Sequence, residues 1–177
     1  MSRTLIATFE DEFRRYRLLA EKAMVQLSDD ALNRVVAPEG NSIAMLVRHI
    51  SGNFLSRFTD FLTSDGEKPW RDRDGEFGTR VYGRAEMEEM WQRGWGVLER
   101  ELAALTDADV EREVSIRGQP LRVHEALARS VSHAAYHVGQ IVLLARMLAE
   151  DEWKWLTIPK GKSVEYNQAP TLEKGPR

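Results

Sequence analysis

The fold of this chain is decided by residues 123–149, which read VHEALARSVSHAAYHVGQIVLLARMLA. Apolar residues recur in this stretch at steps of three or four positions, which is the period of one face of an α-helix. They are Val123, Leu127, Val131, Ala134, Val138, Ile141, Ala145 and Leu148. We therefore predict a long amphipathic helix over residues 123–149.

Three earlier segments show the same period, and four such helices predict an all-α four-helix bundle. The first runs over residues 5–27 and ends at Ser28, the second begins at Asn41 or Ser42 and ends near residues 64–66, and the third covers residues 84–105. A long inter-helix loop is expected at residues 65–83. We also expect a short hairpin around Arg117 and Gly118, and an irregular C-terminal tail at about residues 150–177 that packs on the bundle through its tryptophans.

The composition is that of an ordinary globular protein. Its 177 residues suit a single domain, which we take to span residues 1–177. The net charge of −3 provides no basic footprint, so we expect no nucleic-acid partner and no membrane partner. The absence of cysteine excludes disulfides and thiolate ligands within the chain. Because neither a signal peptide nor an apolar run of about 18 residues is visible, we expect a cytoplasmic protein.

Two of the four histidines share one face of the predicted helix 123–149. His133 and His137 are separated by about 40° around the helix axis and one turn along it, so both imidazoles can reach one metal ion. His49 lies midway along the second predicted helix and could meet the pair from there. Three neutral nitrogens with one open position are typical of a catalytic zinc site. Such ligands must be neutral, so metal binding should weaken as the pH falls through about 6.5.

Other interpretations of the histidines stay open. A pair at this spacing also occurs without a metal, where each imidazole is hydrogen-bonded at the edge of the core. His124 faces the opposite side of the helix from His133, so we expect no metal role for it. The zinc-protease motif is excluded because Ala134 replaces its glutamate. The chain has no Glu-x-x-His pair, which excludes a di-iron carboxylate bundle.

Four stretches carry a resemblance to a known group of proteins. They are NSIAMLVRHISGN (41–53), SRFTDFLTSDGEKPWRDRD (56–74), HAAYHVGQI (133–141) and WKWLTIPKGKS (153–163). In them the chain resembles the DinB-like superfamily of metal-binding four-helix bundles, and within it the branch called DUF1572. The resemblance implies that a histidine of the second helix and a His-x-x-x-His pair of the fourth bind zinc, nickel or a similar ion. The matching positions are His49, His133 and His137.

The resemblance also implies a class of activity, although this branch has no assigned reaction. Relatives include thiol transferases and isomerases that use low-molecular-weight bacterial thiols, and many are homodimers. We therefore expect a metal-dependent transferase or hydrolase with a small-molecule substrate, such as a low-molecular-weight thiol, in a homodimer. The alternative is a non-catalytic metal-binding protein or a dimeric, stress-related binding module.

Asn53 is the candidate catalytic residue. It follows His49 by one helical turn, so both side chains should face the same region. There its amide could orient a substrate or donate a hydrogen bond to a metal-bound group. The alternative is that Asn53 only solvates the boundary of the helix.

The loop at residues 65–83 has two possible roles. Its basic residues Lys68, Arg71, Arg73 and Arg80 could bind an anionic cosubstrate. Its acidic residues cancel most of that charge, and they are Asp65, Glu67, Asp72, Asp74 and Glu76. We therefore favour a structural loop with internal ion pairs. Lys160 and Lys162 of the tail offer an equally weak anion site.

Overall fold

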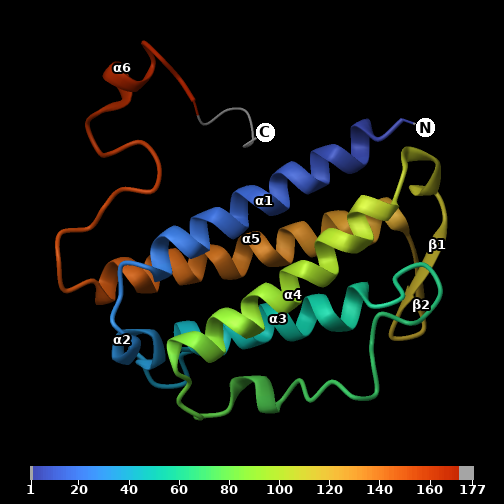
Figure 1. Ribbon diagram of the computed structural model, residues 1–177, viewed down its shortest axis with the longest axis horizontal. Coiled ribbons are helices and arrows are strands. Elements are labelled where there is room, and N and C mark those ends of the chain that lie inside the picture. Colours follow the sequence, from blue (N-terminus) through green and yellow to red (C-terminus); the bar gives the residue numbers. More distant parts are fainter. Residues whose placement is uncertain (1, 172–177) are drawn as a thin grey trace.

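Figure 1 shows the chain in a computed structural model, which describes residues 2–171. The long helices are α1 (Thr4–Met24), α3 (Ile43–Phe58), α4 (Arg84–Ala104) and α5 (Val123–Leu148). The connections and the tail hold the short helices α2 (Asp29–Asn33) and α6 (Ser163–Tyr166) and the 3-10 turns η1 (Gly75–Phe77) and η2 (Asp107–Asp109). Strands β1 (Glu113–Ile116) and β2 (Gln119–Arg122) pair as a small antiparallel sheet. The chain is therefore mainly helical, with one small two-stranded sheet where the short hairpin was expected.

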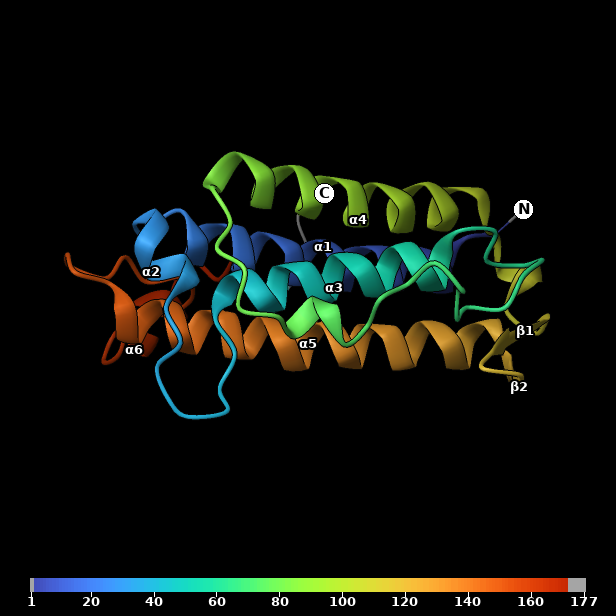
Figure 2. The ribbon, with the colours of Figure 1, turned by 90° about the horizontal axis from the view of Figure 1, so that it is seen from below.

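The long helices lie side by side, with α4 on one side, α5 on the other, and α1 and α3 between them (Figure 2). Helix α3 packs on α4 and on α5, and α1 packs on α5. The core between α1, α3 and α4 is aromatic. The ring of Phe54 lies 5.9 Å from that of Phe13 and 4.8 Å from that of Trp95, and all three side chains are buried. Edge-on ring pairs of this kind add to the stabilisation that burial alone provides.

Helix α3 is the central element that carries the candidate site. Its contact with α4 is close, because a Cβ at Gly94 would lie only 2.6 Å from Cα of Ser51. A larger residue at position 94 would push the two helices apart. Most side chains of α3 are consequently buried, His49 among them.

The ends of α3 explain one difference from the sequence-based boundaries. Ser42 caps the helix as expected, since its hydroxyl accepts a hydrogen bond from the backbone N–H of Met45 at 3.2 Å. The helix then ends at Phe58, although the apolar period continues to Phe61. The chain leaves the helix because Thr59 is extended and Asp60 adopts a left-handed φ of 52°. Phe61 is still buried, from a turn instead of a helix.

The expected hairpin is present and anchors the long connection after α3. Arg117 and Gly118 form its turn with φ values of 56° and 68°, a left-handed pair that suits a two-residue hairpin loop. The carboxylate of Asp65 accepts hydrogen bonds from both of their backbone N–H groups, at 2.8 and 2.7 Å. The hydrogen bond from the hydroxyl of Ser115, together with those from the backbone N–H groups of Glu67, Gly118 and Arg117, holds the pKa of Asp65 well below its usual range.

The chain after α5 is irregular apart from α6, as expected. Trp153 packs against the core, whereas Trp155 is 43% exposed and stacks under the guanidinium of Arg146, 4.5 Å away. The last part of the predicted tail, residues 172–177, lies outside the described residues. Within the described residues, no helix combines the length and the apolar character that crossing a membrane would need.

Candidate metal centre

The three histidines singled out by the sequence meet between α3 and α5. Nε2 of His49 lies 3.1 Å from Nε2 of His133, which lies 3.2 Å from Nε2 of His137. All three ligand atoms lie within 4.8 Å of one another, close enough to hold one metal ion. In the part of the chain that the structure describes, no other group of three histidine or carboxylate side chains comes so close together.

Hydrogen bonds at the far side of two rings set their orientation. Nδ1 of His49 lies 2.8 Å from Oε2 of Glu76, and Nδ1 of His137 lies 2.8 Å from Oε1 of Gln140. Both partners are acceptors, so we assign the proton of each ring to Nδ1. The Nε2 lone pairs then point at the centre, and metal-binding histidines are commonly held by such an outer acceptor.

The donor set fits a divalent cation better than it fits hydrogen bonds among the imidazoles. Nδ1 of His133 is buried and has no hydrogen-bond partner among the described residues. That atom lacks a partner whether or not a metal is bound, so the Nε2 atoms decide the comparison. With the protons of His49 and His137 on Nδ1, their two Nε2 lone pairs face His133, whose single N–H can satisfy only one of them. Without a cation a buried acceptor stays unsatisfied, which costs free energy. Tetrahedral zinc–nitrogen bonds separate the nitrogens by about 3.3 Å. The observed 3.1 and 3.2 Å separations are close to that value.

Glu76 is held as a carboxylate beneath the cluster. Arg71 donates two hydrogen bonds to it, at 2.8 and 2.9 Å, and the side chains of Arg71 and Glu76 are only 2% and 5% exposed. Burial alone would raise the pKa of Glu76, but the hydrogen bonds and charges of His49 and Arg71 outweigh it and lower the pKa. Gly52 of α3 makes room for the carboxylate, because a Cβ there would lie 2.2 Å from Oε1.

Burial also keeps two of the imidazoles neutral. It lowers the pKa of His133 to about 3, helped by the charges of His137 and His49 and of nearby arginines. The pKa of His137 is lowered as well, mainly by burial. Both groups are therefore neutral at physiological pH, which is the form that binds metal.

A cleft of about 390 Å³ opens beside the histidines. Its walls come from α3, α5, the hairpin and the connection between α3 and α4, which is called the 60–83 connection after its residue numbers and contains the 65–83 loop. They are Asn41, His49, Asn53, Arg57, Arg71, Arg73, Phe77, Ile116, Arg117, Arg129, Ser130, His133, Tyr136, His137 and Gln140. The volume falls in the range of small-molecule sites.

Asn53 lines this cleft together with His49, as its position one turn later predicts. Its side chain is buried, and its amide forms no hydrogen bond with another described residue. Tyr136 is 64% exposed, with its ring edge-on to His137. His124 lies elsewhere, with Nδ1 3.0 Å from the carbonyl oxygen of Val110.

The loop at residues 65–83 contains the ion pairs that the sequence analysis favoured. Besides the pair of Arg71 and Glu76, Glu67 accepts hydrogen bonds from Arg57 and Arg117. Lys68 is buried and donates to the hydroxyl of Ser64, so it does not face the cleft. Arg80 pairs with Glu86 instead, while Lys162 of the tail pairs with Glu165.

Sequence analysis missed two residues that orient the histidines. Glu76 is one of five acidic residues in the loop, and nothing in the local sequence distinguishes it from the others. Gln140 was detectable, because a side chain three positions after His137 lies on the same helical face.

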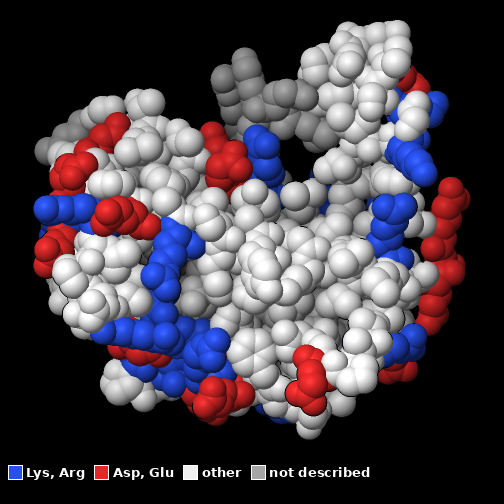
Figure 3. Space-filling view, turned by 180° about the vertical axis from the view of Figure 1, so that it is seen from behind, with Lys and Arg blue, Asp and Glu red and all other residues white. Residues whose placement is uncertain are grey.

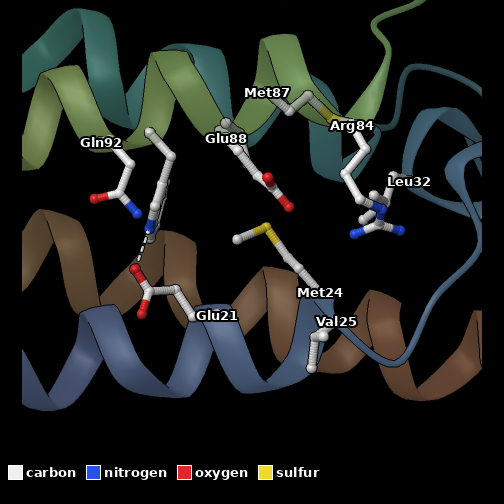
Figure 4. A pocket seen from close by; sticks show the side chains of 10 residues that line it. Glu21, Met24, Val25, Leu32, Arg84, Met87, Glu88 and Gln92 are labelled. Carbon is white, nitrogen blue, oxygen red and sulfur yellow. Dashed lines mark hydrogen bonds between the residues drawn. The ribbon is translucent and has the colours of Figure 1, made fainter.

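A second cavity, of about 320 Å³, lies between α1 and α4 (Figure 4). Its walls are mainly apolar, with Met24, Leu32 and Met87 among them. Glu21 contributes a carboxylate, but it accepts a hydrogen bond from the indole N–H of Trp91 at 3.0 Å. No histidine lines this cavity, so the metal-ligating chemistry of the described residues is confined to the cleft beside α5.

The fold and the site define a mainly helical protein with a three-histidine cluster that could hold a metal ion. A family model described as a protein of unknown function, DUF1572, matches residues 1–162, and the chain belongs to this family. The predicted DUF1572 branch is thereby confirmed. Neither the curated proteins nor the solved structures contain a match to the chain.

Proposed function

We propose that this chain is a metal-binding protein of the DinB-like four-helix-bundle type that holds one divalent ion through His49, His133 and His137. The observation that carries the proposal is the convergence of three Nε2 atoms, two of them oriented by an outer acceptor. The three facing Nε2 atoms support it, because without a cation the one available N–H, that of His133, can satisfy only one of the two lone pairs of His49 and His137. Neutral imidazoles suit zinc and nickel, the two ions we propose.

We further propose that the protein is a metal-dependent transferase for a low-molecular-weight thiol. When bound, a divalent ion with three neutral ligands supplies positive charge that favours the anionic form of a thiol or water beside it. In the transfer, the thiol sulfur forms a bond to an electrophilic carbon, the leaving group departs with its bonding electrons, and the thiol proton passes to solvent. The chain has no cysteine, so the sulfur comes from a cosubstrate.

The roles of the chain's own residues in this reaction follow from the cleft. Asn53 has an amide without a partner among the described residues, so it can orient the substrate by a hydrogen bond. The ring of Phe77 lies 4.8 Å from that of His49 and covers one side of the cluster, which limits the access of water. His49 and His137 keep their Nδ1 protons on Glu76 and Gln140, so neither is a proton acceptor for the substrate.

One observation favours the alternative, a non-catalytic binding module. Among the described residues that line the cleft, none is an aspartate or glutamate that could act as a general base. A hydrolase that needs such a base is therefore the less favoured enzyme. Thiol transfer does not need one, because a thiol whose anionic form is stabilised already loses its proton near neutral pH.

We also propose that the protein forms a homodimer. Tyr136, Leu143 and Met147 are 64%, 61% and 63% exposed on α5. Exposed apolar side chains that cluster on one helix face mark contact surfaces more often than isolated ones do.

The proposal is tested in two stages, the first being metal content. After loading with Zn²⁺ or Ni²⁺ and removal of free ion, the wild-type chain should retain about one ion per chain, as a single three-histidine site predicts. His133→Ala should lose most of it, and His124→Ala should retain it. Equal retention by both variants would show that the cluster is not the site.

The second stage measures activity with the metal-loaded protein. Consumption of an electrophile should depend on an added low-molecular-weight thiol and should vanish in His137→Ala. Asn53→Ala should retain its metal and lose rate, because only substrate orientation is affected. If the wild type and His137→Ala react at the same rate across a broad panel of thiols, the non-catalytic module is the correct alternative.

A further inference from the structure

The cleft beside the histidines has an unusual charge. Five of the residues that line it are arginines, and no acidic side chain is among the described ones. The arginines are Arg57, Arg71, Arg73, Arg117 and Arg129. Figure 3 shows the largest group of Lys and Arg side chains at the lower left of the molecule, with others along the opposite edge. This concentration occurs in a chain whose net charge is −3, so the overall composition does not explain it.

The five acidic residues of the 65–83 loop do not cancel the charge of the five cleft arginines, three of which lie outside that loop. Asp65 is committed to the turn of the hairpin. Asp72 accepts a hydrogen bond from the backbone N–H of Gly75 at 2.9 Å, and the side chain of Asp74 is fully exposed to solvent. Only Glu67 and Glu76 meet arginines of the cleft. Two carboxylates thus face five guanidinium groups.

Two of the arginines remain available to a ligand. Arg129 is exposed and forms no ion pair or hydrogen bond with another described residue. Arg73 has a 3.9 Å contact with the solvated carboxylate of Asp74, an exposed pair that contributes little. Its guanidinium also lies 5.8 Å from the ring centre of Phe77, a contact that uses none of its N–H donors. Positive charge also exceeds negative charge around Arg57, another arginine that lines the cleft. Burial and the charges of Arg71 and Arg117 lower the pKa of Arg57 despite its bond to Glu67.

The position of Arg129 relates the basic residues to the histidines. It precedes His133 by four residues on α5, so the two side chains share a face and lie about 6 Å apart along the helix axis. Ser130, which is buried, and the hairpin residue Arg117 line the same cleft. A molecule that reaches the histidines would therefore place its other end among the arginines, about one helical turn away.

From this geometry we infer that the cleft is a binding site for a small oxyanion, a carboxylate or phosphate group, held by Arg129 and Arg73. Guanidinium groups bind both kinds of oxyanion through paired N–H donors. The inference rests on the proposed function, since it assigns an anionic substrate to the same cleft. The oxyanion is the part of the substrate that the arginines recognise, away from the atom that reacts. The cleft volume of about 390 Å³ limits the substrate to a small molecule.

The test uses the full chain without metal, so that anion binding is separated from metal binding. At about pH 8 and low ionic strength, ordinary histidines are neutral and contribute no charge. Inorganic phosphate and malate are titrated separately by calorimetry into the wild type, Arg129→Gln, Arg73→Gln and Arg129→Lys. Arg100→Gln is the matched control, because Arg100 is exposed on α4 and does not line the cleft.

We expect saturable binding of at least one anion by the wild type and by Arg100→Gln. Arg129→Gln and Arg73→Gln should each raise Kd by about tenfold, the loss expected for a charge-assisted hydrogen bond. Arg129→Lys should recover part of the affinity, because it retains the charge without the paired donors. Binding of phosphate alone or of malate alone would identify the anion. No saturable binding of either anion, or equal affinity in the two cleft variants and Arg100→Gln, would overturn the inference.

The two proposals can fail separately, because metal content and anion affinity are measured on the same set of variants. If no variant binds a divalent ion but the arginine dependence persists, the proposed function fails and the oxyanion site stands. If metal is bound but the arginine variants bind the anion as Arg100→Gln does, the metal-site proposal stands and the oxyanion site is wrong.

Discussion

Oε2 of Glu76 lies 2.8 Å from Nδ1 of His49, although 27 positions separate the two residues in the chain. This contact makes the 60–83 connection part of the histidine cluster, because η1 carries Glu76 and packs on α3. Arg71, from the same connection, holds the other side of the carboxylate. A buried chain of guanidinium, carboxylate and imidazole therefore leads to the candidate metal position.

Replacing Glu76 by glutamine should weaken metal binding. The variant can still accept a hydrogen bond from His49, but it removes the negative charge and leaves Arg71, which is 2% exposed, without its ionic partner. Loss of such an outer partner typically lowers metal affinity about 10- to 100-fold. The measurement is competition with a chelator, with circular dichroism to confirm that the variant is folded. Asp74→Asn, in the same loop and facing solvent, should leave the affinity unchanged.

Gly52→Ala should disturb the site without touching a proposed ligand. The added methyl group would lie 2.2 Å from Oε1 of Glu76, so the carboxylate must move away from His49. We expect a loss of metal affinity similar to that of Glu76→Gln. Gly139→Ala is the matched control, because a Cβ there meets nothing within 4 Å. In a helix that change should stabilise the fold by about 0.5–1 kcal/mol and leave metal binding intact. Equal metal affinities in the two alanine variants would contradict this account.

The sequence predicted the helices and the histidines because both depend on local periodicity. A helix repeats every 3.6 residues, so the apolar stripe of α5 and the shared face of His133 and His137 follow from spacing alone. The position of Asn53 relative to His49 was predictable for the same reason. The DUF1572 assignment also came from contiguous stretches of sequence, and the family match over residues 1–162 confirms it.

What the sequence did not reveal are contacts that depend on the path of a loop. Counting the charges of residues 65–83 predicted that acids and bases cancel. In space the carboxylates of Asp65, Asp72 and Asp74 point to the hairpin, the backbone and the solvent. Arg71 and Arg73 of the loop line the cleft together with three arginines from other parts of the chain. The end of α3 at Phe58 was missed for a related reason, since Phe61 satisfies the apolar period from outside the helix.

The pH dependence should differ from the sequence-based expectation of a fall through about pH 6.5. The pKa of His133 is lowered to about 3 and that of His137 is lowered too, both first of all by burial. At His133 and His137, protons therefore compete with the metal only at lower pH. Protonation of a ligand with an ordinary histidine pKa would lower the metal affinity about tenfold between pH 7.5 and 5.5. Protonation of His133 should lower it far less over the same range. Calorimetry at the two pH values measures the change.

The lowered pKa of His133 also predicts how the free energy of unfolding of the metal-free protein depends on pH. The unfolded chain, with ordinary histidines, binds protons below about pH 6.5, whereas folded His133 does not until about pH 3. Above about pH 6.5 His133 is neutral in both the folded and the unfolded state, so its titration does not change the free energy of unfolding. Between about pH 6.5 and pH 3 only the unfolded chain binds the proton, so acid favours unfolding. Chemical denaturation should therefore show a free energy of unfolding that falls as the pH is lowered from about 6.5. A His133 resonance that titrates near its ordinary value in metal-free protein would disprove both expectations.

The exposed stripe of α5 predicts how the proposed homodimer forms. Leu143 and Met147 follow Tyr136 by seven and eleven positions, so all three point within about 20° of one direction. The middle of this face of the molecule is largely free of charged side chains (Figure 3). A second copy seated there would lie next to the cleft, because Tyr136 belongs to both the stripe and the cleft wall.

Leu143→Glu should therefore convert a dimer to a monomer in sedimentation at micromolar concentration. The substitution buries a charge at the contact, while the exposed site predicts a change in monomer stability within about 0.5 kcal/mol. Val81→Glu is the control, since Val81 is 74% exposed but lies in the 60–83 connection and outside the stripe. If the partner shields the cleft, Leu143→Glu should also change the affinity for phosphate or malate, whereas Val81→Glu should not. A wild-type monomer, or a dimer that survives Leu143→Glu, would remove α5 as the interface.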